Sequence, residues 1–372
     1  MRLPGFVGAS NPSRSRSASV ERTTNLYPEM VDGSSGPAQT LLRGRPAVTP
    51  YCCLPSGPVR AMYSMDGRGF AVGGSRFYEI FADRTAVQRG VLAVDGNPAT
   101  ISSNGSAGYQ MLVTSGGVGY RYGLKTNALA PVTDPDAPSP MTMAAFLDGY
   151  FIGLQGQSRQ FKLSSLEDGA TWDGLDVGEV SFSADNIRAM AILQRQVWFF
   201  GSKATNIWYN SGAESFALSP LGGALIEHGV LAPWSVQVLD NTLYFLGADA
   251  NGQGQVWRMN GYTPIRISSN ALEYQLSRSE RLAEAIAWAM QYEGHTWYAL
   301  YVPDLPTTWL YDVPTNTWVE WGVWDPDLMD FRPFPARCHC VFNGQHLVGD
   351  WTTGAIYNLS LDVHEDTIVE AA

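Results

Sequence analysis

The feature that most constrains the fold is a pair of short aromatic-aliphatic segments that recurs seven times along the chain from Gly57 onward. In each pair the first segment ends near a glycine or another small residue, a turn follows, and the second segment is centred on aromatic residues. The first segments are 70–73, 111–114, 150–153, 197–201, 243–247, 297–300 and 346–349, and the second are 77–80, 120–122, 160–163, 206–209, 255–259, 309–312 and 355–359. A repeat of roughly 40–50 residues is typical of the blades of a β-propeller.

The physics of such a repeat favours a propeller over a sandwich. A small sheet that is apolar on both faces cannot bury them alone, whereas radial stacking of sheets covers both and leaves only short edges. We therefore expect an all-β fold, a β-propeller with seven blades, and the pattern leaves six or eight blades open. The last unit, residues 336–361, has room for only three strands. A strand within residues 40–53 is expected to complete it and close the ring.

Composition supports short strands and excludes some functions. The chain has 12 Trp, 17 Tyr, 38 Gly and 22 Pro, a mixture that favours aromatic strands joined by tight turns. Asp and Glu total 35 against 24 Lys and Arg, a net charge of −11. This balance argues against tight binding along a nucleic-acid backbone. No apolar run approaches the roughly 20 residues of a membrane span, and the N-terminus lacks a signal-peptide core, so we expect synthesis in the cytoplasm.

Three regions depart from the repeat. The polar segment 130–140 reads as a stiff, proline-rich connector. The stretch from Ser279 to Met290 is the best candidate for a helix, with Arg281, Glu284, Ala285 and Trp288 at helical spacing. Residues 324–334 form a long aromatic and acidic loop, and long loops on rigid scaffolds tend to carry contacts.

The domain organisation predicted from these patterns has three parts. Residues 1–50 form an extended N-terminal arm, part of which closes the propeller; residues 51–361 form the propeller; residues 362–372 form an acidic C-terminal tail. Within the arm, Leu26 and Tyr27 can be buried, and Pro28 keeps Tyr27 extended. We expect the arm to lie on the folded body or on a neighbouring molecule, and a loose tail is the alternative.

The motifs that could carry chemistry indicate structure instead. Ser165, Asp168, Gly169 and Trp172 belong to a turn that approximates the Asp box of sialidase-like propellers, which is a structural turn remote from the active site. We expect Asp168–Gly169 to make the turn and Trp172 to pack on apolar neighbours. The carboxylates around it share one turn-rich loop, whereas a glycosidase needs two that face each other across the substrate. Cys52, Cys53, Cys338 and Cys340 read as free thiols, because no C-x-x-C pair is present. The prediction is no enzyme, no metal and no cofactor.

In its sequence motifs the chain resembles the packaged-DNA stabilisation proteins, also called tail hub or nozzle proteins, of short-tailed bacteriophages. The resemblance runs from about residue 10 to residue 361 and rests on several modest matches in the same order. They are 24–29 (TNLYPE), 166–176 (LEDGATWDGLD), 198–201 (WFFG), 207–213 (IWYNSGA), 226–229 (IEHG), 260–268 (NGYTPIRIS), 292–295 (YEGH) and 308–312 (TWLYD) with Trp318.

The resemblance implies a structural protein of the virion tail, assembled in the host cytoplasm. It implies a hexameric ring below the portal and its head-to-tail adaptor that retains packaged DNA and forms the conduit for ejection. A tail needle, tailspike or tail fibre could dock on it, and DNA would pass without sequence-specific binding. The candidate partner-contact residues are Arg14, Arg16, Asn25, Tyr27 and Glu29 of the arm. The alternatives are a glycan-binding or sialidase-like propeller with an arginine-rich or acid-paired central pocket, and a cellular propeller scaffold that binds peptides.

Overall fold

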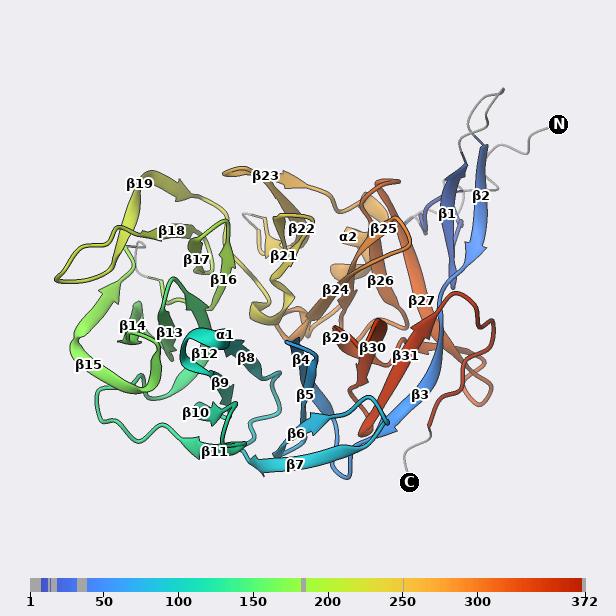
Figure 1. The fold of residues 1–372 in the computed structure, drawn as a ribbon. Coiled ribbons are helices and arrows are strands. Elements are labelled where there is room, and N and C mark those ends of the chain that lie inside the picture. The colour runs from blue at the N-terminus through green and yellow to red at the C-terminus, as the bar shows by residue number, and fades with distance from the viewer. Residues whose placement is uncertain are drawn as a thin grey trace.

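The computed structural model describes residues 8–12, 14, 19–31, 39–181, 185–249 and 251–369. Over these residues the chain is a seven-bladed, all-β propeller from which a two-stranded hairpin projects (Figure 1). Every blade is an antiparallel sheet of four or five strands. The first strands of the seven blades contact one another in a closed cycle, which places them around the axis of the ring.

The blades follow one another along the chain, except that the last one takes its outermost strand from the N-terminal region. The first blade is β4 (Val59–Met65), β5 (Arg68–Gly73), β6 (Arg76–Ile80) and β7 (Ala86–Val91). The second is β8 (Thr100–Ser103), β9 (Gln110–Ser115), β10 (Val118–Gly123) and β11 (Ala128–Pro131). The third is β12 (Met141–Leu147), β13 (Tyr150–Gln155), β14 (Gln160–Ser165) and β15 (Asp168–Glu179). The fourth is β16 (Ala189–Leu193), β17 (Gln196–Phe200), β18 (Thr205–Asn210) and β19 (Leu218–Ile226).

The remaining blades have the same order from the axis outward. The fifth is β20 (Gln237–Leu239), β21 (Thr242–Ala248), β22 (Gly254–Asn260) and β23 (Thr263–Arg266). The sixth is β24 (Ile286–Tyr292), β25 (His295–Tyr301), β26 (Thr308–Asp312), β27 (Thr317–Asp325) and β28 (Asp330–Pro333). The seventh is β29 (Ala336–Phe342), β30 (Gln345–Asp350), β31 (Ala355–Ser360) and β3 (Ala47–Cys53), and the separate hairpin is β1 (Leu26–Val31) with β2 (Gln39–Gly44).

The aromatic segments singled out in the sequence are the second and third strands of the seven blades. The prediction of a seven-bladed propeller is therefore confirmed. These strands are buried almost throughout, as in the pattern of β17, where Val197, Trp198, Phe199 and Phe200 are all buried. Their side chains pack between blades: the ring of Phe161 on β14 stacks on Phe199 of the next blade with centroids 4.3 Å apart. Contacts of this kind supply the face-to-face burial that a single blade lacks.

Ring closure is made by β3, which pairs antiparallel with β31 at the outer side of the seventh blade (Figure 1). Val48 lies opposite Leu359 and is fully buried, and Tyr51 is 4% exposed. The strand expected within residues 40–53 is thus present. The tail reinforces it, because Thr367 N donates to Val48 O at 2.8 Å and Val48 N donates to Asp366 Oδ1 at 3.1 Å. The first and last segments of the chain therefore hold each other.

Three local predictions were wrong. Residues 324–334 are not one long loop, because β27 runs to Asp325 and β28 (Asp330–Pro333) pairs back on it. The stretch from Ser279 to Met290 is not a helix: α2 spans Asn270–Leu276, residues Leu282–Glu284 form one 3-10 turn, and Trp288 lies on β24. Trp288 is 2% exposed against neighbouring blades, so tertiary burial overrides the helical spacing. The turn before β15 is not made by Asp168–Gly169 but by Leu166–Glu167, where Glu167 has φ of 55°, and Gly169 is extended on β15.

Gly229, between the fourth and fifth blades, gives a test of blade packing. A Cβ added there would lie 2.3 Å from the carbonyl carbon of Ser202 and 2.4 Å from the nitrogen of Lys203. Because both are backbone atoms, we expect Gly229→Ala to destabilise the fold by about 1–3 kcal/mol, as overpacking usually does. Gly222→Ala on β19 is the matched control, since nothing lies within 4 Å of that position. Equilibrium urea unfolding compares the two, and equal midpoints would contradict the packing described.

Candidate functional site

The propeller encloses a central cavity of about 260 Å³ lined by the first strands of its blades. Most lining side chains are apolar: Ala61, Met62, Ile101, Met143, Met190, Trp234, Ile286 and Trp288. The polar ones include Arg60, Gln237, Arg337 and His339, and none of the described lining residues is Asp or Glu. The volume corresponds to roughly nine water molecules at about 30 Å³ each, whereas the major groove of DNA alone is about 12 Å wide. A duplex therefore cannot pass through the propeller's own axis.

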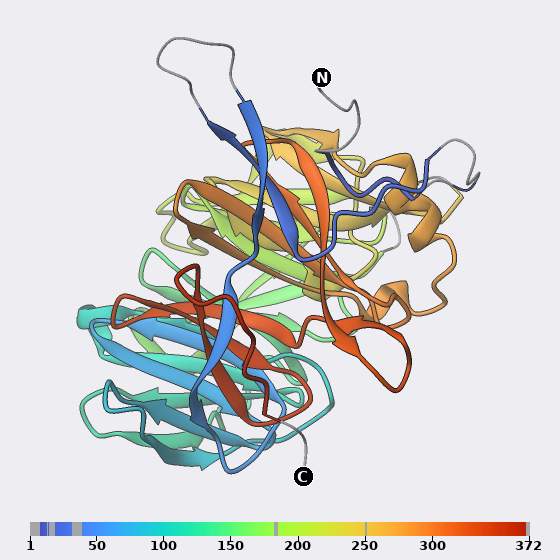
Figure 2. The same cartoon turned by 90° about the vertical axis from the view of Figure 1, so that its right-hand side faces the viewer.

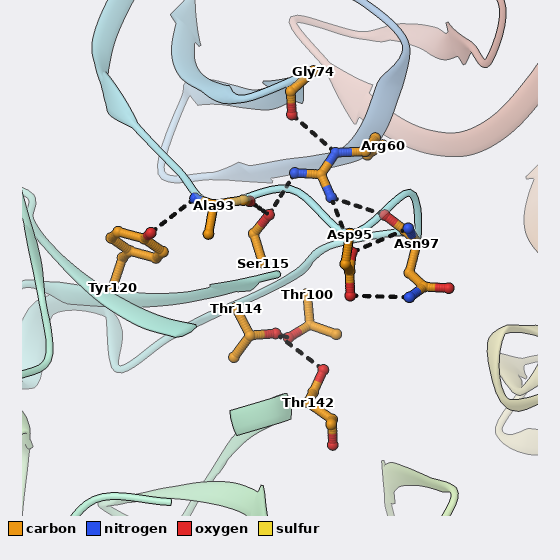
Figure 3. A network of polar contacts seen from close by, with 10 residues as sticks. All are labelled: Arg60, Gly74, Ala93, Asp95, Asn97, Thr100, Thr114, Ser115, Tyr120 and Thr142. Carbon is orange, nitrogen blue, oxygen red and sulfur yellow. Dashed lines mark hydrogen bonds and ion pairs between the residues drawn. The ribbon is translucent and has the colours of Figure 1, made fainter. Parts of the chain in front are cut away.

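The first of the two cavity arginines, Arg60 on β4, links the first and second blades through hydrogen bonds (Figure 3). Its Nε donates to Gly74 O and its Nη1 to Asn97 O, both at 2.9 Å, and its Nη2 donates to Ser115 Oγ. The Asp95 carboxylate lies 3.8 Å away. Burial lowers the pKa of Arg60, and the guanidinium directs its donors at its own chain.

A second set of contacts in Figure 3 continues the same junction toward the third blade. The hydroxyls of Thr100 and Thr114 are hydrogen-bonded at 2.5 Å, and Thr114 Oγ1 donates to Thr142 O on β12 at 3.5 Å. Threonine pairs across strands are among the pairs that stabilise a sheet. The polar groups next to the axis thus join blades.

Arg337 on β29 is the counterpart of Arg60 in the seventh blade, since each follows the first residue of its strand at a register shift. Its Nη1 donates to Ala336 O at 2.7 Å and to Phe334 O, and its guanidinium carbon lies 3.3 Å from the ring centroid of Tyr301. Burial lowers its pKa to about 10. Arg60 donates to two backbone carbonyls and the Ser115 hydroxyl, and Arg337 donates to two backbone carbonyls and lies over the ring of Tyr301. These contacts within the chain make the cavity unlike an arginine-rich or acid-paired sugar site.

The Asp-box-like turn of the third blade is hydrogen-bonded to the second blade. Asp168 Oδ1 accepts from Ala170 N at 3.1 Å and Oδ2 accepts from Thr171 Oγ1 at 2.7 Å, and these bonds lower the pKa of Asp168 against the effect of its partial burial. Gln110 on β9 donates to Asp168 Oδ1 at 3.1 Å and accepts from Gly169 N at 3.0 Å. Asn104 Nδ2 also donates to Glu167 O at 3.0 Å, so two side chains of the second blade bind the turn.

Trp172 packs as predicted. It is 5% exposed within a cluster that includes Leu112, Met141 and Phe151, and its Nε1 donates to Gly169 O at 3.2 Å. Ser165 ends β14, where it lies opposite Asp168. These four residues make a structural element, and their carboxylate faces Gln110 and Thr171 rather than a cavity.

Glu320 on β27 holds the N-terminal segment to the sixth blade, a role that the sequence did not signal. This carboxylate is 2% exposed, accepts from Ser10 Oγ at 2.8 Å and Thr307 Oγ1 at 2.6 Å, and pairs with Arg22 Nη2 at 2.6 Å. The backbone joins as well, because Glu320 N donates to Thr23 O at 2.9 Å and Asn25 N donates to Glu320 O at 2.7 Å. The arm residues described here therefore lie on their own propeller (Figure 2).

Of the three arm residues in the sequence motif, Asn25 and Tyr27 contact the sixth blade and Glu29 pairs within the hairpin. Asn25 Nδ2 donates to Gly322 O, and Asn25 Oδ1 accepts from Gly322 N, both at 2.9 Å. Tyr27 is fully buried, edge-on to His295 at 4.7 Å and to Trp297 at 5.3 Å between centroids. Glu29 is half-buried and pairs with Arg43 at 3.0 Å across the hairpin. Their predicted contact with a partner stays a prediction.

Arg14, the other described candidate for partner contact, lines a cavity of about 360 Å³ between the arm and the sixth blade, and Arg16 lies outside the described residues. Arg22 and Arg278 line the same cavity, together with the aromatic rings of Tyr274 and Trp309. Only Glu320 supplies a carboxylate among the described lining residues. The cavity is therefore cationic, in contrast to the net charge of the chain.

The cysteine and histidine side chains in the described part of the chain are not grouped as metal ligands. Cys52, Cys53, Cys338 and Cys340 are free thiols, and burial raises the pKa of Cys52 and of Cys340 to about 12. Among the described residues no group of three His, Cys, Asp or Glu side chains is placed to hold a metal ion. Within that same part of the chain, no helix is long and apolar enough to span a bilayer.

Comparison with known proteins gives one matching family model and several solved structures with a similar fold. A family model described as bacteriophage P22 Gp10, β-propeller, matches residues 18–364. Virginiamycin B lyase from Staphylococcus aureus superposes with a TM-score of 0.52 at 11% identity, over 82% of this chain and 95% of the lyase. YCF48 from Cyanidioschyzon merolae superposes with a TM-score of 0.53 at 13% identity, over 85% of this chain and 99% of YCF48. No curated protein matches in sequence. At such identities the two structures show the propeller fold alone.

Proposed function

Because this chain belongs to the bacteriophage P22 Gp10 family of β-propeller stabilisation proteins, we propose that it is a structural component of the virion tail hub or nozzle. In this role several copies, six in our proposal, form a ring below the portal and its head-to-tail adaptor. The ring retains the packaged genome and then gives it passage at infection. The observation that carries the proposal is the family match, which covers nearly the whole described propeller.

The geometry of the cavity supports a conduit between copies rather than through one copy. The cavity on the propeller axis is small, about 260 Å³, and its lining includes methionine and tryptophan side chains together with Arg60 and Arg337. DNA therefore travels through a hole that several propellers surround. A net charge of −11 suits a wall that repels phosphates, so that DNA slides past without sequence-specific contacts.

The same features support a protein without a reaction centre or cofactor. The arginines of the central cavity donate to carbonyls of their own chain, and its described lining residues include no carboxylate. Most glycosidases use two facing carboxylates. The glycan-binding alternative left open by the sequence thus gains no support from the cavity.

The partners in this proposal are the adaptor and portal, with a needle, tailspike or fibre on the far side of the ring, and no membrane. Assembly takes place in the host cytoplasm and the working location is the virion tail. Arg14 and the cationic cavity around it are the proposed adaptor contact, since an acidic partner surface would complement them. Arg16 would extend this contact.

The test is to produce phage particles without this chain. We expect them to package DNA and then lose it, measured as DNA that becomes sensitive to nuclease after packaging, with retention restored by the purified chain. The matched control supplies the chain with Val91→Asp, which changes an exposed side chain on β7. Particles that keep nuclease-resistant DNA without the chain would contradict the proposed function.

A further inference from the structure

The central cavity borders a buried positive charge that has no ion-pair partner in the described part of the chain. Arg337 on β29 is 7% exposed, and no acidic oxygen of the described residues lies within 4.0 Å of its guanidinium nitrogens. Asp350 acts on this charge from farther away, and its own oxygens accept hydrogen bonds from Thr352, Thr353 and Tyr357. Because a guanidinium keeps its proton, burial of this charge without a counter-charge is costly.

Two buried hydrogen-bond donors at the same cavity lack an acceptor. Arg337 Nη1 donates to Ala336 O and Phe334 O, whereas Arg337 Nε has no partner among the described residues. Nε1 of Trp288, a side chain that is 2% exposed, has no acceptor in that part of the chain either. Of the described residues, only these two both line the cavity and carry a buried polar side-chain atom without a hydrogen bond. Since buried donors in folded proteins nearly always have a partner, we expect an acceptor inside the cavity.

The other ionisable side chains of the described lining are already satisfied or are uncharged. Arg60 uses all three guanidinium nitrogens as donors and has the Asp95 carboxylate at 3.8 Å (Figure 3). His339 Nε2 shares a hydrogen bond with His346 Nδ1 at 3.1 Å, and burial lowers the pKa of His339 to about 3, so its ring is neutral. No Asp or Glu belongs to the described lining. The uncompensated charge in the cavity is therefore positive and belongs to Arg337.

We propose that the central cavity binds a small inorganic anion, with the Arg337 guanidinium as its counter-charge and the Trp288 indole N–H as a second donor. An anion neutralises the buried charge and accepts from both donors at once. A cavity of about 260 Å³ has room for chloride, or for a tetrahedral oxyanion such as phosphate, together with water. Trp288 lies on β24 and Arg337 on β29, so the anion joins the first strands of the sixth and seventh blades. Because the site exists only in the folded ring, the anion stabilises the propeller.

The location of the anion is tested on the wild-type chain. Crystals grown in bromide, with no other halide and no oxyanion, reveal bound bromide through its anomalous scattering, and crystals grown in phosphate without halide form the second arm. We expect an anion in the central cavity in at least one arm, in contact with the Arg337 guanidinium or with Trp288 Nε1. A cavity that holds only water in both arms would overturn the inference.

Thermal unfolding at neutral pH, with chloride or phosphate added to a halide-free buffer, gives the apparent affinity for each anion. We expect Arg337→Gln to bind the preferred anion about 10-fold or more weakly than wild type, and Trp288→Phe about 3-fold or more weakly. Arg76→Gln is the matched control, because Arg76 is exposed on β6 and has no ion-pair partner in the described part of the chain. General salt effects act on all variants alike.

The solution and crystal results together decide the matter. If Arg337→Gln does not fold, Trp288→Phe and the wild-type crystals still test the site. Wild type, control and both cavity variants that respond equally to chloride and to phosphate would overturn the inference. An anion seen in the crystals with no such effect in solution would be an adventitious ion only, and would overturn it too.

Discussion

A chain that lacks residues 1–53 is expected to fail to form a stable propeller, while a chain that lacks residues 1–45 still folds. The longer deletion removes β3, and with it the buried side chains of Val48 and Tyr51 and the ladder along β31. Full burial of one such side chain is worth about 1.5–3 kcal/mol, and total domain stability is only about 5–15 kcal/mol. We therefore expect a loss of at least about 4 kcal/mol relative to the shorter deletion.

The shorter deletion is the matched control, because both truncated chains lack the arm, including Tyr27. Urea unfolding followed by tryptophan fluorescence gives the stabilities, and size exclusion reveals association through the uncovered edge of β31. If the two chains unfold at the same urea concentration, ring closure by β3 does not contribute to the stability of the propeller.

The second large effect is expected for Tyr27→Ala. Tyr27 is fully buried against His295 and Trp297, and replacing a buried aromatic side chain with alanine costs about 3–5 kcal/mol. The arm can detach without unfolding the blades, so the loss should appear as local opening. Hydrogen exchange should speed up across residues 19–31 and 39–46, with the inner strands of the propeller unchanged.

Tyr27→Phe is the control for this prediction. Burial raises the pKa of Tyr27, and its hydroxyl has no hydrogen-bond partner among the described residues. Removing that hydroxyl should therefore leave the stability within about 1 kcal/mol of wild type. Fast exchange in the phenylalanine variant, or protection of the arm in the alanine variant, would show that the ring of Tyr27 does not anchor the arm.

Much of the fold could be predicted because its signal is local. Segments such as 197–201 and 243–247 are continuously apolar and end near glycine, which fits strands covered on both faces. Closure by a strand within residues 40–53 followed from counting, since the last unit was one strand short. The burial of Trp172 followed from its size. Each of these inferences uses only neighbouring residues and the need to cover apolar surface.

The remaining features depend on contacts between distant residues. Trp288 has helical spacing to Glu284, yet the adjacent blades bury it on β24. Glu320 looks like any strand glutamate until Ser10 and Arg22 meet it from about 300 residues away. The hydrogen bonds of Arg60 and Arg337 could not be predicted from the sequence, because their acceptors are mostly backbone carbonyls, which carry no sequence signal.

The most direct measurement is electron cryomicroscopy of the phage tail with its genome still packaged. The account predicts a ring of copies of this propeller directly below the adaptor, with DNA density in the hole that the copies surround and none along any propeller axis. DNA density threading the cavity beside Arg60 and Arg337, or tails in which this chain is absent from the ring, would contradict it.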